Sequence, residues 1–283
     1  MLAVLPALGL FIGASTAANA SAGHTVKSVS AAKTDKDAQA KAAAVAFVKT
    51  LRVGFHSHSH PVVGHARSPV SALTQVTSTN WSGYADTGSG FSAVSASWTE
   101  PTPTCSGRTE SLAAFWVGID GYSSSSVEQD GTLIECYQGK AYQYTWWEIY
   151  PVNDIQVVGE SLAAGDAIKA TVTRSGTSYK LTVTDSTHTA NSFSTTQTYT
   201  GGADSSAEWI AEAPSGSSGV EPLAKFSTWT DANSAVTEGS TAGVISSFTD
   251  DEITMITSSG ATEAQPSALN SAGNGFTVTW VRS

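Results

Sequence analysis

Positive charge is scarce in this sequence outside its N-terminal quarter. Charged residues make up only 13% of the 283 residues, and the formal net charge is −10. Residues 76–283 hold seven Lys and Arg against twenty-two Asp and Glu. Phosphate groups are bound by basic patches, so this balance argues against a nucleic-acid partner. It suits a protein that works where carboxylates are partly protonated, although many secreted proteins are simply acidic.

The motifs of several enzyme classes are also missing. The sequence contains no G-x-S-x-G, no HExxH, no P-loop and no GxGxxG motif. Residues 76–283 contain a single histidine, His188, on which any Ser-His or Cys-His nucleophile would have to be built. His188 lies in a polar stretch, where a surface position is the simpler interpretation. We therefore expect no metal and no other cofactor, and a chemistry that rests on carboxylates, amides or aromatic side chains.

Cysteine is nearly absent. The two cysteines, Cys105 and Cys136, belong neither to a CxxC pair nor to a zinc-binding spacing. In an exported protein the simplest expectation is one disulfide, which closes a loop of about thirty residues and stabilises the fold by about 3 kcal/mol. Two buried free thiols are the alternative.

The apolar run at the N-terminus is too short to cross a membrane. Residues 2–13, LAVLPALGLFIG, number about a dozen, whereas a membrane helix needs about twenty. Ala18-Asn19-Ala20 then fits the A-x-A cleavage pattern, although the positively charged start of a signal peptide is missing. We interpret residues 1–20 as a signal peptide and expect a secreted protein that is not attached to a membrane in its mature form.

Residues 21–75 have the character of a pro-segment. The first 75 residues carry seven Lys and Arg against two Asp, a net charge of +5. Residues 35–53 are rich in Ala and favour helix, with Val45, Val48 and Leu51 on one face, while the rest is helical or disordered. We expect this basic leader to cover the acidic body as an inhibitor until acid protonates the carboxylates.

Most of the histidines lie in the same segment. The stretch HSHSHPVVGHARSP contains His56, His58, His60 and His65. Alternating histidines can chelate a metal, and histidines gain charge below about pH 6, so they could form a pH latch. A polar linker is the third interpretation, and the sequence leaves the three open.

From residue 77 onward, short runs of β-forming residues alternate with turn residues. Such runs occupy residues 91–101, 156–172, 226–231, 242–258 and 275–283. Residues 168–186 have the pattern of a hairpin that turns at Gly176, and no long amphipathic helix is expected after residue 76. The pattern predicts one all-β domain over residues 76–283. We expect a two-sheet antiparallel β-sandwich of the concanavalin-like or jelly-roll kind, with a concave face open to an extended ligand.

The stretch richest in aromatic residues is QYTWWEIYP, residues 143–151. In a strand, Tyr144, Trp146, Glu148 and Tyr150 face one side and the residues between them face the other. One face must belong to the core, and the other could line a site for an extended polymer. Packing on both faces is the alternative.

Two other stretches offer polar candidates. Residues 115–132, FWVGIDGYSSSSVEQDGT, contain Trp116, Asp120 and Gln129, and in a strand Val127 and Gln129 share one face. A glutamine amide does not titrate, so Gln129 would be an unusual site residue. The stretch SAEWIAEAP then adds two carboxylates four positions apart.

This combination of segments resembles the glutamic peptidases, also called eqolisins or peptidase family G1. The matching segments, in the family's order, are NWSGYA (80–85), WVGIDG (116–121), EQDGT (128–132), WWEIYP (146–151) and SAEWIAE (206–212). The resemblance implies a secreted precursor, a two-sheet β-sandwich and cleavage of proteins at acid pH by a glutamine and a glutamate.

The resemblance also implies roles for individual residues. The family's catalytic glutamine falls on Gln129, and its catalytic glutamate falls on Glu212. The positions that match substrate-binding residues of the site are Trp81, Trp116, Asp120, Trp146 and Glu148. The implied partners are protein or peptide substrates, and we expect a monomer.

Three positions depart from the family pattern. Tyr144 stands where an acidic residue is expected four positions before Glu148, Ser206 replaces an Asn, and Ala213 follows the catalytic glutamate. These departures leave the catalytic pair intact and bear on substrate preference. The cysteine pair does not follow from the resemblance.

The two glutamates of SAEWIAE cannot act as a tight pair. In a strand, Glu208 and Glu212 share a face with their carboxylates about 13–14 Å apart. Glu212 would work with Gln129 from another strand, and Glu208 is most simply a neighbour nearer the rim. A glutamate with an ordinary pKa near 4.3 would suit an enzyme that acts in acid.

Two other functions remain open. One is a glycoside hydrolase on a similar sandwich, with Glu148 and Glu212 as the two carboxyls, which retaining chemistry would place about 5–5.5 Å apart. The other is a non-catalytic sandwich that binds carbohydrate or protein. The first leaves Gln129 without a role, and the second does not explain a basic leader in front of an acidic body.

Overall fold

The computed structural model describes residues 22–54, 74–107 and 109–283. The chain divides into two compact units, residues 1–42 and residues 43–283. The interpretation of residues 1–20 as a signal peptide and that of the four histidines between residues 55 and 66 fall outside the described residues. No helix in the described part of the chain has the length and the hydropathy that a membrane crossing requires.

In the part of the chain that the structure describes, helix is confined to the leader, apart from two short 3₁₀ turns. Helix α1 (Ala22–Val48) spans the division between the units and covers most of the range for which helix is expected. The 3₁₀ turns are η1 (Thr189–Asn191) and η2 (Ile245–Ser247). The described residues from Thr74 onward contain no α-helix, as expected.

The described residues of the second unit form twenty short strands. They are β1 (Thr74–Ser78), β2 (Trp81–Thr87), β3 (Phe91–Thr99), β4 (Pro103–Thr104), β5 (Ser111–Asp120), β6 (Val127–Tyr137), β7 (Lys140–Tyr150), β8 (Asn153–Gly159), β9 (Ala167–Ser175), β10 (Ser178–Asp185), β11 (Phe193–Thr198), β12 (Ser206–Glu212), β13 (Ser215–Gly216), β14 (Gly219–Val220), β15 (Lys225–Phe226), β16 (Trp229–Glu238), β17 (Thr241–Gly243), β18 (Asp250–Ile256), β19 (Thr262–Pro266) and β20 (Gly275–Trp280). The boundaries predicted between the leader segments and the body stay predictions.

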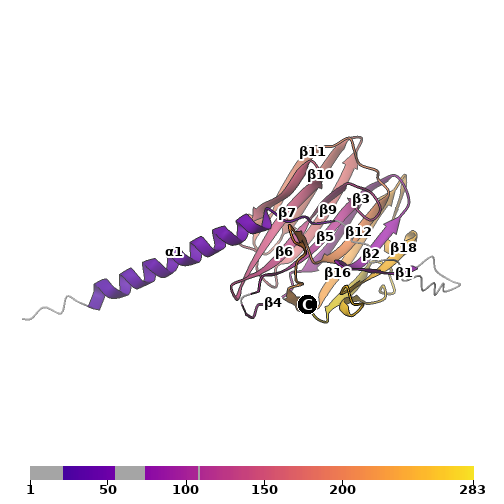
Figure 1. Ribbon diagram of the computed structural model, residues 1–283. Coiled ribbons are helices and arrows are strands. Elements are labelled where there is room, and N and C mark those ends of the chain that lie inside the picture. Colours follow the sequence, from indigo (N-terminus) through magenta and orange to yellow (C-terminus); the bar gives the residue numbers. More distant parts are fainter. Residues whose placement is uncertain (1–21, 55–73, 108) are drawn as a thin grey trace, which may run out of the picture. The chain divides into compact units, whose positions relative to one another are not determined.

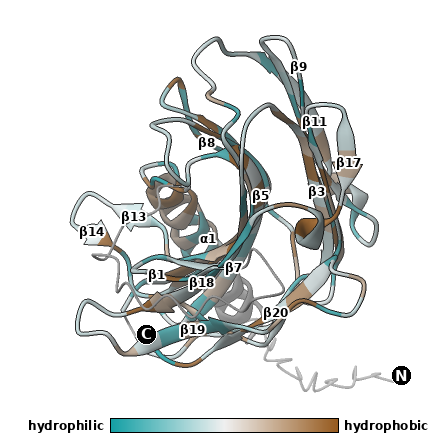
Figure 2. Ribbon diagram, turned by 90° about the vertical axis from the view of Figure 1, so that its right-hand side faces the viewer, coloured by the Kyte–Doolittle hydropathy of each residue, from teal (hydrophilic) through white to brown (hydrophobic). Residues whose placement is uncertain are grey.

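The strands pair into two layers. One layer has the order β11-β10-β9-β3-β16-β20, the other has the order β18-β2-β12-β5-β6-β7-β8, and β19 connects them. Pairing along this path is antiparallel, whereas β1 runs parallel to β18. The order of labelled strands can be followed in Figure 1, and Figure 2 shows the two curved layers packed face to face. The predicted antiparallel β-sandwich is confirmed.

Local sequence explains why these strands form where they do. In the β9–β10 hairpin, Ile168, Ala170 and Val172 are buried and alternate with more exposed residues. Gly176 turns the chain with φ of +61°, a conformation that glycine adopts without the steric cost of a Cβ atom. The hairpin expected over residues 168–186 is therefore confirmed.

Two apolar clusters lie on opposite faces of the β2-β12-β5-β6-β7 strands. The core cluster draws from both layers and fills the space between them, and it includes Trp209 on β12 and Ile149 on β7. The other cluster covers the outward face of the same strands, which we call the site face. Tyr144 and Trp146 belong to this site-face cluster. Residues 143–151 thus present one face to the core, as predicted, and the other to this second cluster; that the second face lines a site stays a prediction.

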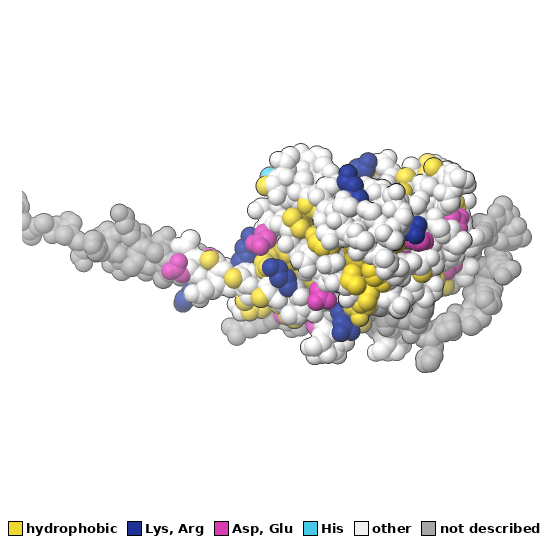
Figure 3. Space-filling view, turned by 90° about the horizontal axis from the view of Figure 1, so that it is seen from above, with side chains coloured by type: hydrophobic (Ala, Val, Ile, Leu, Met, Phe, Trp, Pro, Cys, Tyr) yellow, Lys and Arg dark blue, Asp and Glu magenta, His cyan; other side chains and the backbone are white. Residues whose placement is uncertain are grey.

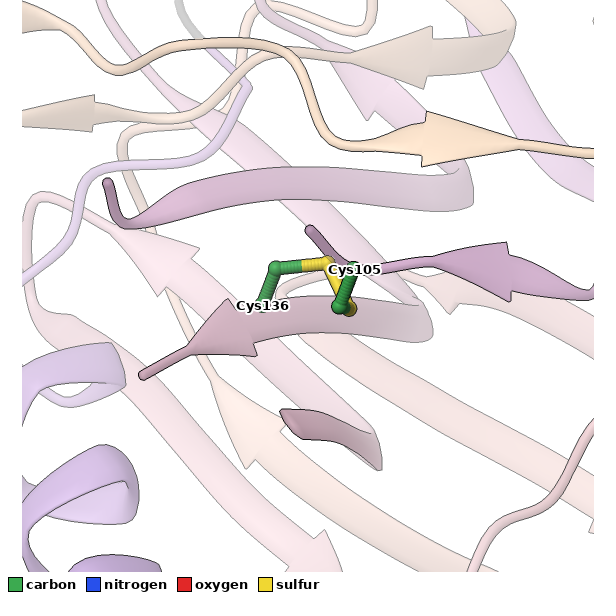
Figure 4. The surroundings of a disulfide bond; sticks show 2 residues. All are labelled: Cys105 and Cys136. Carbon is green, nitrogen blue, oxygen red and sulfur yellow. A yellow bond between two sulfur atoms is a disulfide. The ribbon is translucent and has the colours of Figure 1, made fainter. Parts of the chain in front are cut away.

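A disulfide connects the segment after β4 to strand β6. Cys105, just after β4, is bonded to Cys136 near the end of β6, across 31 positions of sequence (Figure 4). The expected pairing is confirmed. Closing a loop of this length stabilises a fold by about 3 kcal/mol, chiefly by restricting the unfolded chain.

Many of the acidic side chains are buried rather than displayed. The face drawn in Figure 3 carries few charged side chains. Glu128 on β6 and Asp86 on β2 are fully buried on the core side of their strands. Burial raises the pKa of Glu128 to about 9, with Asp120 and Asp204 adding to the shift and Arg174 opposing it. Burial, with the nearby charges of other acidic groups, also raises the pKa of Asp86 to about 9.

These raised pKa values predict a fold that is most stable in acid. Below about pH 4 both groups are protonated in the folded and in the unfolded chain, so their full contribution to the free energy of unfolding is present there. As the pH rises toward their folded pKa of about 9, only the unfolded chain ionises freely, and stability is lost. We expect the melting temperature, followed by circular dichroism, to fall steadily between about pH 4 and about pH 9.

The variant Glu128→Gln isolates one of these groups. Its neutral amide cannot ionise, so its melting temperature should match that of the wild type near pH 4 and exceed it at pH 8, by about 2–4 °C for each kcal/mol recovered. The exposed Glu160→Gln is the matched control and should follow the wild type. A melting temperature that is flat or rising over this range would contradict the burial argument.

Candidate active site

Neighbouring strands bring Gln129 and Glu212 onto the same face of the sheet. Glu212 is the last residue of β12, Gln129 lies in β6, and β5 runs between these two strands. Alternation puts Glu212 on the same side as Ile210, and Gln129 on the same side as Leu133, both members of the site-face cluster. Both polar side chains are fully buried. The two candidate catalytic residues, 83 positions apart in sequence, thus share one compartment.

The Glu212 carboxyl is surrounded by N–H donors. The Trp116 indole donates from Nε1 to Oε2 at 2.9 Å, and the Gly54 backbone amide donates to the same oxygen at 2.9 Å. Asn80 donates from Nδ2 to Oε1 at 3.3 Å. These contacts, together with the Trp81 side chain, favour the ionised carboxylate.

Burial nevertheless dominates the titration of Glu212. Desolvation raises the pKa of Glu212 well above its usual range, and the hydrogen bonds from Gly54, Trp116 and Asn80 offset only part of that rise. The expectation of an ordinary pKa near 4.3 is therefore wrong for the covered site.

The Gln129 amide is oriented by Glu148. The two residues are directly paired across β6 and β7, and Gln129 Nε2 donates to Glu148 Oε2 at 2.8 Å. The same nitrogen donates to the Val53 carbonyl oxygen at 2.7 Å. Oε1 of Gln129 is buried and has no hydrogen-bond partner among the described residues. Glu148 therefore holds the amide with its N–H group toward the leader segment.

Glu148 is itself buried beside the catalytic pair. Desolvation raises its pKa well above the usual range, the charge of Glu212 raises it further, and hydrogen bonds with Gln129 and the Val53 backbone oppose the rise. A neutral Glu148 avoids a second negative charge next to Glu212.

Gly118 on β5 makes room for this arrangement. A Cβ atom at this position would lie 2.9 Å from the Trp116 ring and 3.2 Å from Cβ of Gln129. Only a glycine lets the indole and the amide approach each other across the strand.

The tryptophans assigned to the site lie on its face. Trp81 and Trp116 pack edge to face, with ring centroids 5.1 Å apart. Trp146 belongs to the same site-face cluster, and its Nε1 has no hydrogen-bond partner among the described residues. Together they give the catalytic pair apolar walls.

Asp120 has a different environment from the one expected. It ends β5 with φ of +70°, and its carboxylate accepts hydrogen bonds from the backbone amides of Ala203, Asp204 and Ser205 and from the Ser205 hydroxyl. The structure therefore gives Asp120 a role in anchoring the loop of residues 203–205. None of the hydrogen bonds named here reaches Gln129 or Glu212.

Two other expectations are refined by the geometry. Glu208 shares the face of Glu212, as the alternation predicts, but it is fully buried rather than near a rim. Tyr144, at the position of an expected acidic residue, donates its hydroxyl to Glu135 Oε2 at 2.9 Å. The departure at Tyr144 thus keeps a carboxyl group nearby, supplied by the neighbouring strand.

Sequence reasoning missed Asn80 and the backbone of Val53 and Gly54. Asn80 stands in the segment NWSGYA beside Trp81, so the segment contained the signal. Val53 and Gly54 contact the pair through main-chain atoms, which no side-chain pattern can reveal.

One group of possible metal ligands occurs among the described residues, and its own hydrogen bonds account for it. Asp166, Asp185 and His188 bring ligand atoms within 4.8 Å of one another. Asp166 contacts His188 Nδ1, and Asp185 accepts bonds from two loop amides and from Asn191. His188 is exposed, as expected for a surface residue.

The chain matches known proteins over most of its second unit. The family model described as the Peptidase A4 family matches residues 79–280. Aspergillopepsin-2 from Aspergillus niger is 27% identical over 229 residues, which cover 72% of this chain and 78% of the relative. Scytalidopepsin B from Scytalidium lignicola is 33% identical over 105 residues, covering 37% of this chain and 38% of the relative.

Solved structures agree with these sequence matches. The crystal structure of scytalido-glutamic peptidase with a transition state analog inhibitor has a TM-score of 0.60 at 25% identity, covering 72% of this chain and 98% of that chain. The structure of aspergilloglutamic peptidase from Aspergillus niger has a TM-score of 0.52 at 29% identity, covering 60% and 99% of the two chains.

The environment of Glu212 predicts the effect of removing the indole donor. Trp116→Phe keeps an aromatic ring at this position but deletes the indole N–H that donates to Glu212 Oε2, so the pKa of Glu212 should rise further. The measurement is an NMR titration of the Glu212 carboxyl carbon. Trp146→Phe, which alters the same cluster without a bond to Glu212, is the matched control and should leave the titration where it is. Equal shifts in both variants would contradict the assignment.

Proposed function

The chain belongs to the Peptidase A4 family, the glutamic peptidases or eqolisins, and is therefore an endopeptidase; on this premise we propose that it is secreted and hydrolyses peptide bonds at acid pH with Gln129 and Glu212 as its catalytic pair. Gln129 stabilises the oxyanion, and Glu212 activates water and then protonates the leaving amine. Trp81, Trp116, Trp146 and Glu148 border the site.

One observation carries this proposal: a single peptide bond lies between the two side chains. The carbonyl oxygen of Val53 accepts a hydrogen bond from Gln129 Nε2 at 2.7 Å, and the amide of Gly54 donates to Glu212 Oε2 at 2.9 Å. Donors that stabilise an oxyanion lie about 2.7–3.1 Å from the oxygen. The contacts of this peptide bond are those that a substrate needs at the start of hydrolysis.

The chemistry follows from the two functional groups. In its ionised form, which the N–H donors of Trp116 and Asn80 favour, Glu212 accepts a proton from a water molecule that attacks the carbonyl carbon. The Gln129 N–H group stabilises the negative charge that develops on the carbonyl oxygen, and its side-chain oxygen can hold the water. Glu212 then passes the proton to the leaving nitrogen. Because Gln129 is neutral, it adds no second titrating charge to the pair.

Acid conditions suit both the site and the fold. Burial raises the pKa of Glu148, so this group stays neutral beside the catalytic pair over a wide range of pH. Asp86 and Glu128 are buried in the core, so the folded state becomes less stable as the pH rises toward their pKa. These features support a working range below neutrality.

The leader acts as an inhibitor in this proposal. Its residues 43–54 belong to the same compact unit as the body. Val45, Val48, Leu51 and Val53 are buried in the site-face cluster, so they cover the apolar surface on which a substrate would lie. The N–H bond that Gly54 donates to Glu212 weakens when this carboxylate is protonated.

Removing either member of the pair should stop catalysis. Glu212→Gln removes the group that carries the proton, and Gln129→Ala removes the oxyanion donor, whose loss alone costs about 100- to 1000-fold in rate. We expect digestion of casein at acid pH to disappear in Glu212→Gln and to fall by at least this factor in Gln129→Ala. The measurement is the release of acid-soluble peptides, with glucan hydrolysis assayed in parallel.

Glu208→Gln is the matched control for these variants. It changes a carboxyl on the same strand and the same face, equally buried, without touching the catalytic pair. Its casein digestion should equal that of the wild type. Full activity in a Glu212→Gln variant that melts like the wild type would remove the mechanism.

Loosening the leader should remove the delay before activity. Leu51→Asp in the full chain places a charge in the site-face cluster, so the leader should no longer cover the site. The progress curve of casein digestion is expected to start without the lag of the wild type. Lys49→Ala changes an exposed side chain of the same segment and should keep the lag. A lag unchanged in Leu51→Asp would argue against inhibition by the leader.

A further inference from the structure

Residues 52–54 are bound to the body through their backbone, in the manner of a substrate strand. The Arg52 amide donates to the Ser215 carbonyl oxygen at 2.8 Å, and the Ser215 amide donates back to Arg52 at 2.9 Å, which forms an antiparallel bridge. The backbone of Val53 bonds to Glu148 and Gln129, and the Gly54 amide donates to Glu212. Main-chain pairing of this kind recognises an extended peptide whatever its sequence.

The side chains of the segment alternate as in a strand. Leu51 and Val53 are 2% and 0% exposed and belong to the site-face cluster, whereas Arg52 between them is exposed. The body therefore buries every second residue among apolar side chains and leaves Arg52 toward solvent. Such apolar surroundings select apolar side chains on the N-terminal side of the bond that lies at the catalytic pair.

The register puts one bond, and not its neighbours, at the catalytic atoms. The Val53 carbonyl oxygen and the Gly54 nitrogen belong to the same peptide unit, and they contact Gln129 and Glu212 respectively. A segment that only blocked the site could run in the opposite direction or set its bonds away from the pair. This segment sets the carbonyl oxygen of one bond at the oxyanion donor and the nitrogen of the same bond at the carboxyl group.

Gly54 makes the close approach possible. It has φ of +90°, and a Cβ atom on it would lie 2.5 Å from Gln129 Nε2. Any other residue would have to displace the catalytic amide or twist the bond away from it. The glycine thus seats the bond directly against Gln129.

We propose that the Val53–Gly54 bond is the site at which this chain cuts itself, inside the predicted 21–75 leader; the proposal rests on the function proposed above. Water adds its oxygen to the Val53 carbonyl carbon while Glu212 takes one of its protons. The C–N bond then breaks, the proton passes to the Gly54 nitrogen, and a carboxyl group on Val53 and an amine on Gly54 result. The docked segment is both the cover of the site and its first substrate.

The test follows the intact chain after a shift to acid. Purified full-length protein is acidified, samples are quenched over time, and the fragments are identified by mass spectrometry, with casein digestion measured on the same samples. We expect the first leader fragment to end at Val53 and its partner to begin at Gly54. Cleavage within one molecule should proceed at a rate that does not change on dilution.

Three variants make the test specific. Glu212→Gln should leave the bond whole. Gly54→Ala should slow this cut on the order of 10- to 100-fold, because the bond is displaced from the pair, while casein digestion by chains whose leader has been released stays unchanged. Lys49→Ala, an exposed change in the same segment, should cut at the same bond at the wild-type rate.

The outcomes separate this proposal from the one on which it rests. If casein is digested but the first cut lies elsewhere, or the leader leaves unbroken, the self-cleavage proposal is overturned and the catalytic proposal stands. The same holds if the Gly54→Ala variant is cut directly after Val53 as fast as the wild type is. If a folded chain digests neither casein nor itself at any acid pH, both proposals fall.

Discussion

Burial of carboxyl groups is the constraint on which the rest of this structure depends. An ionised carboxylate in apolar surroundings is costly, so a buried one either gains donors or keeps its proton. Glu212 gains three N–H donors and still has a raised pKa, whereas Glu128 and Asp86 hold their protons to about pH 9. The same physics therefore governs the catalytic group and the core, and it ties the stability of the fold to acid.

The catalytic pair depends on strand order more than on any local motif. Strands β12, β5, β6 and β7 lie side by side, and each contributes one part: the carboxyl of Glu212, the indole of Trp116, the amide of Gln129 and the carboxyl of Glu148 that orients it. Alternation places all four on the site face. Because Gly118 on β5 has no side chain, the Trp116 ring and the Gln129 side chain can approach each other.

The leader and a substrate would use the same contacts. Leu51 and Val53 fill apolar surface on the site face, and the backbone from Arg52 to Gly54 satisfies Ser215, Gln129 and the catalytic carboxyl. An inhibitor made in this way needs no separate binding surface. Protonation of Glu212 weakens the hydrogen bond that Gly54 donates to it, while a protonated carboxyl costs less to bury.

The sequence by itself determined the class of fold, the hairpin at 168–186, the two faces of residues 143–151 and the family, because these rest on local alternation, turn residues and short segments that read the same in any context. Only the tertiary structure decided that Asp120 anchors a loop, that Glu208 is buried, that Asn80 bonds the catalytic carboxyl, and that Val53–Gly54 lies on the pair. The physical reason is that these facts depend on which groups meet across strands distant in sequence, and several of them involve backbone atoms that every residue possesses. Local pattern specifies a strand and its faces, but packing alone sets what each face touches and how strongly its charges are desolvated.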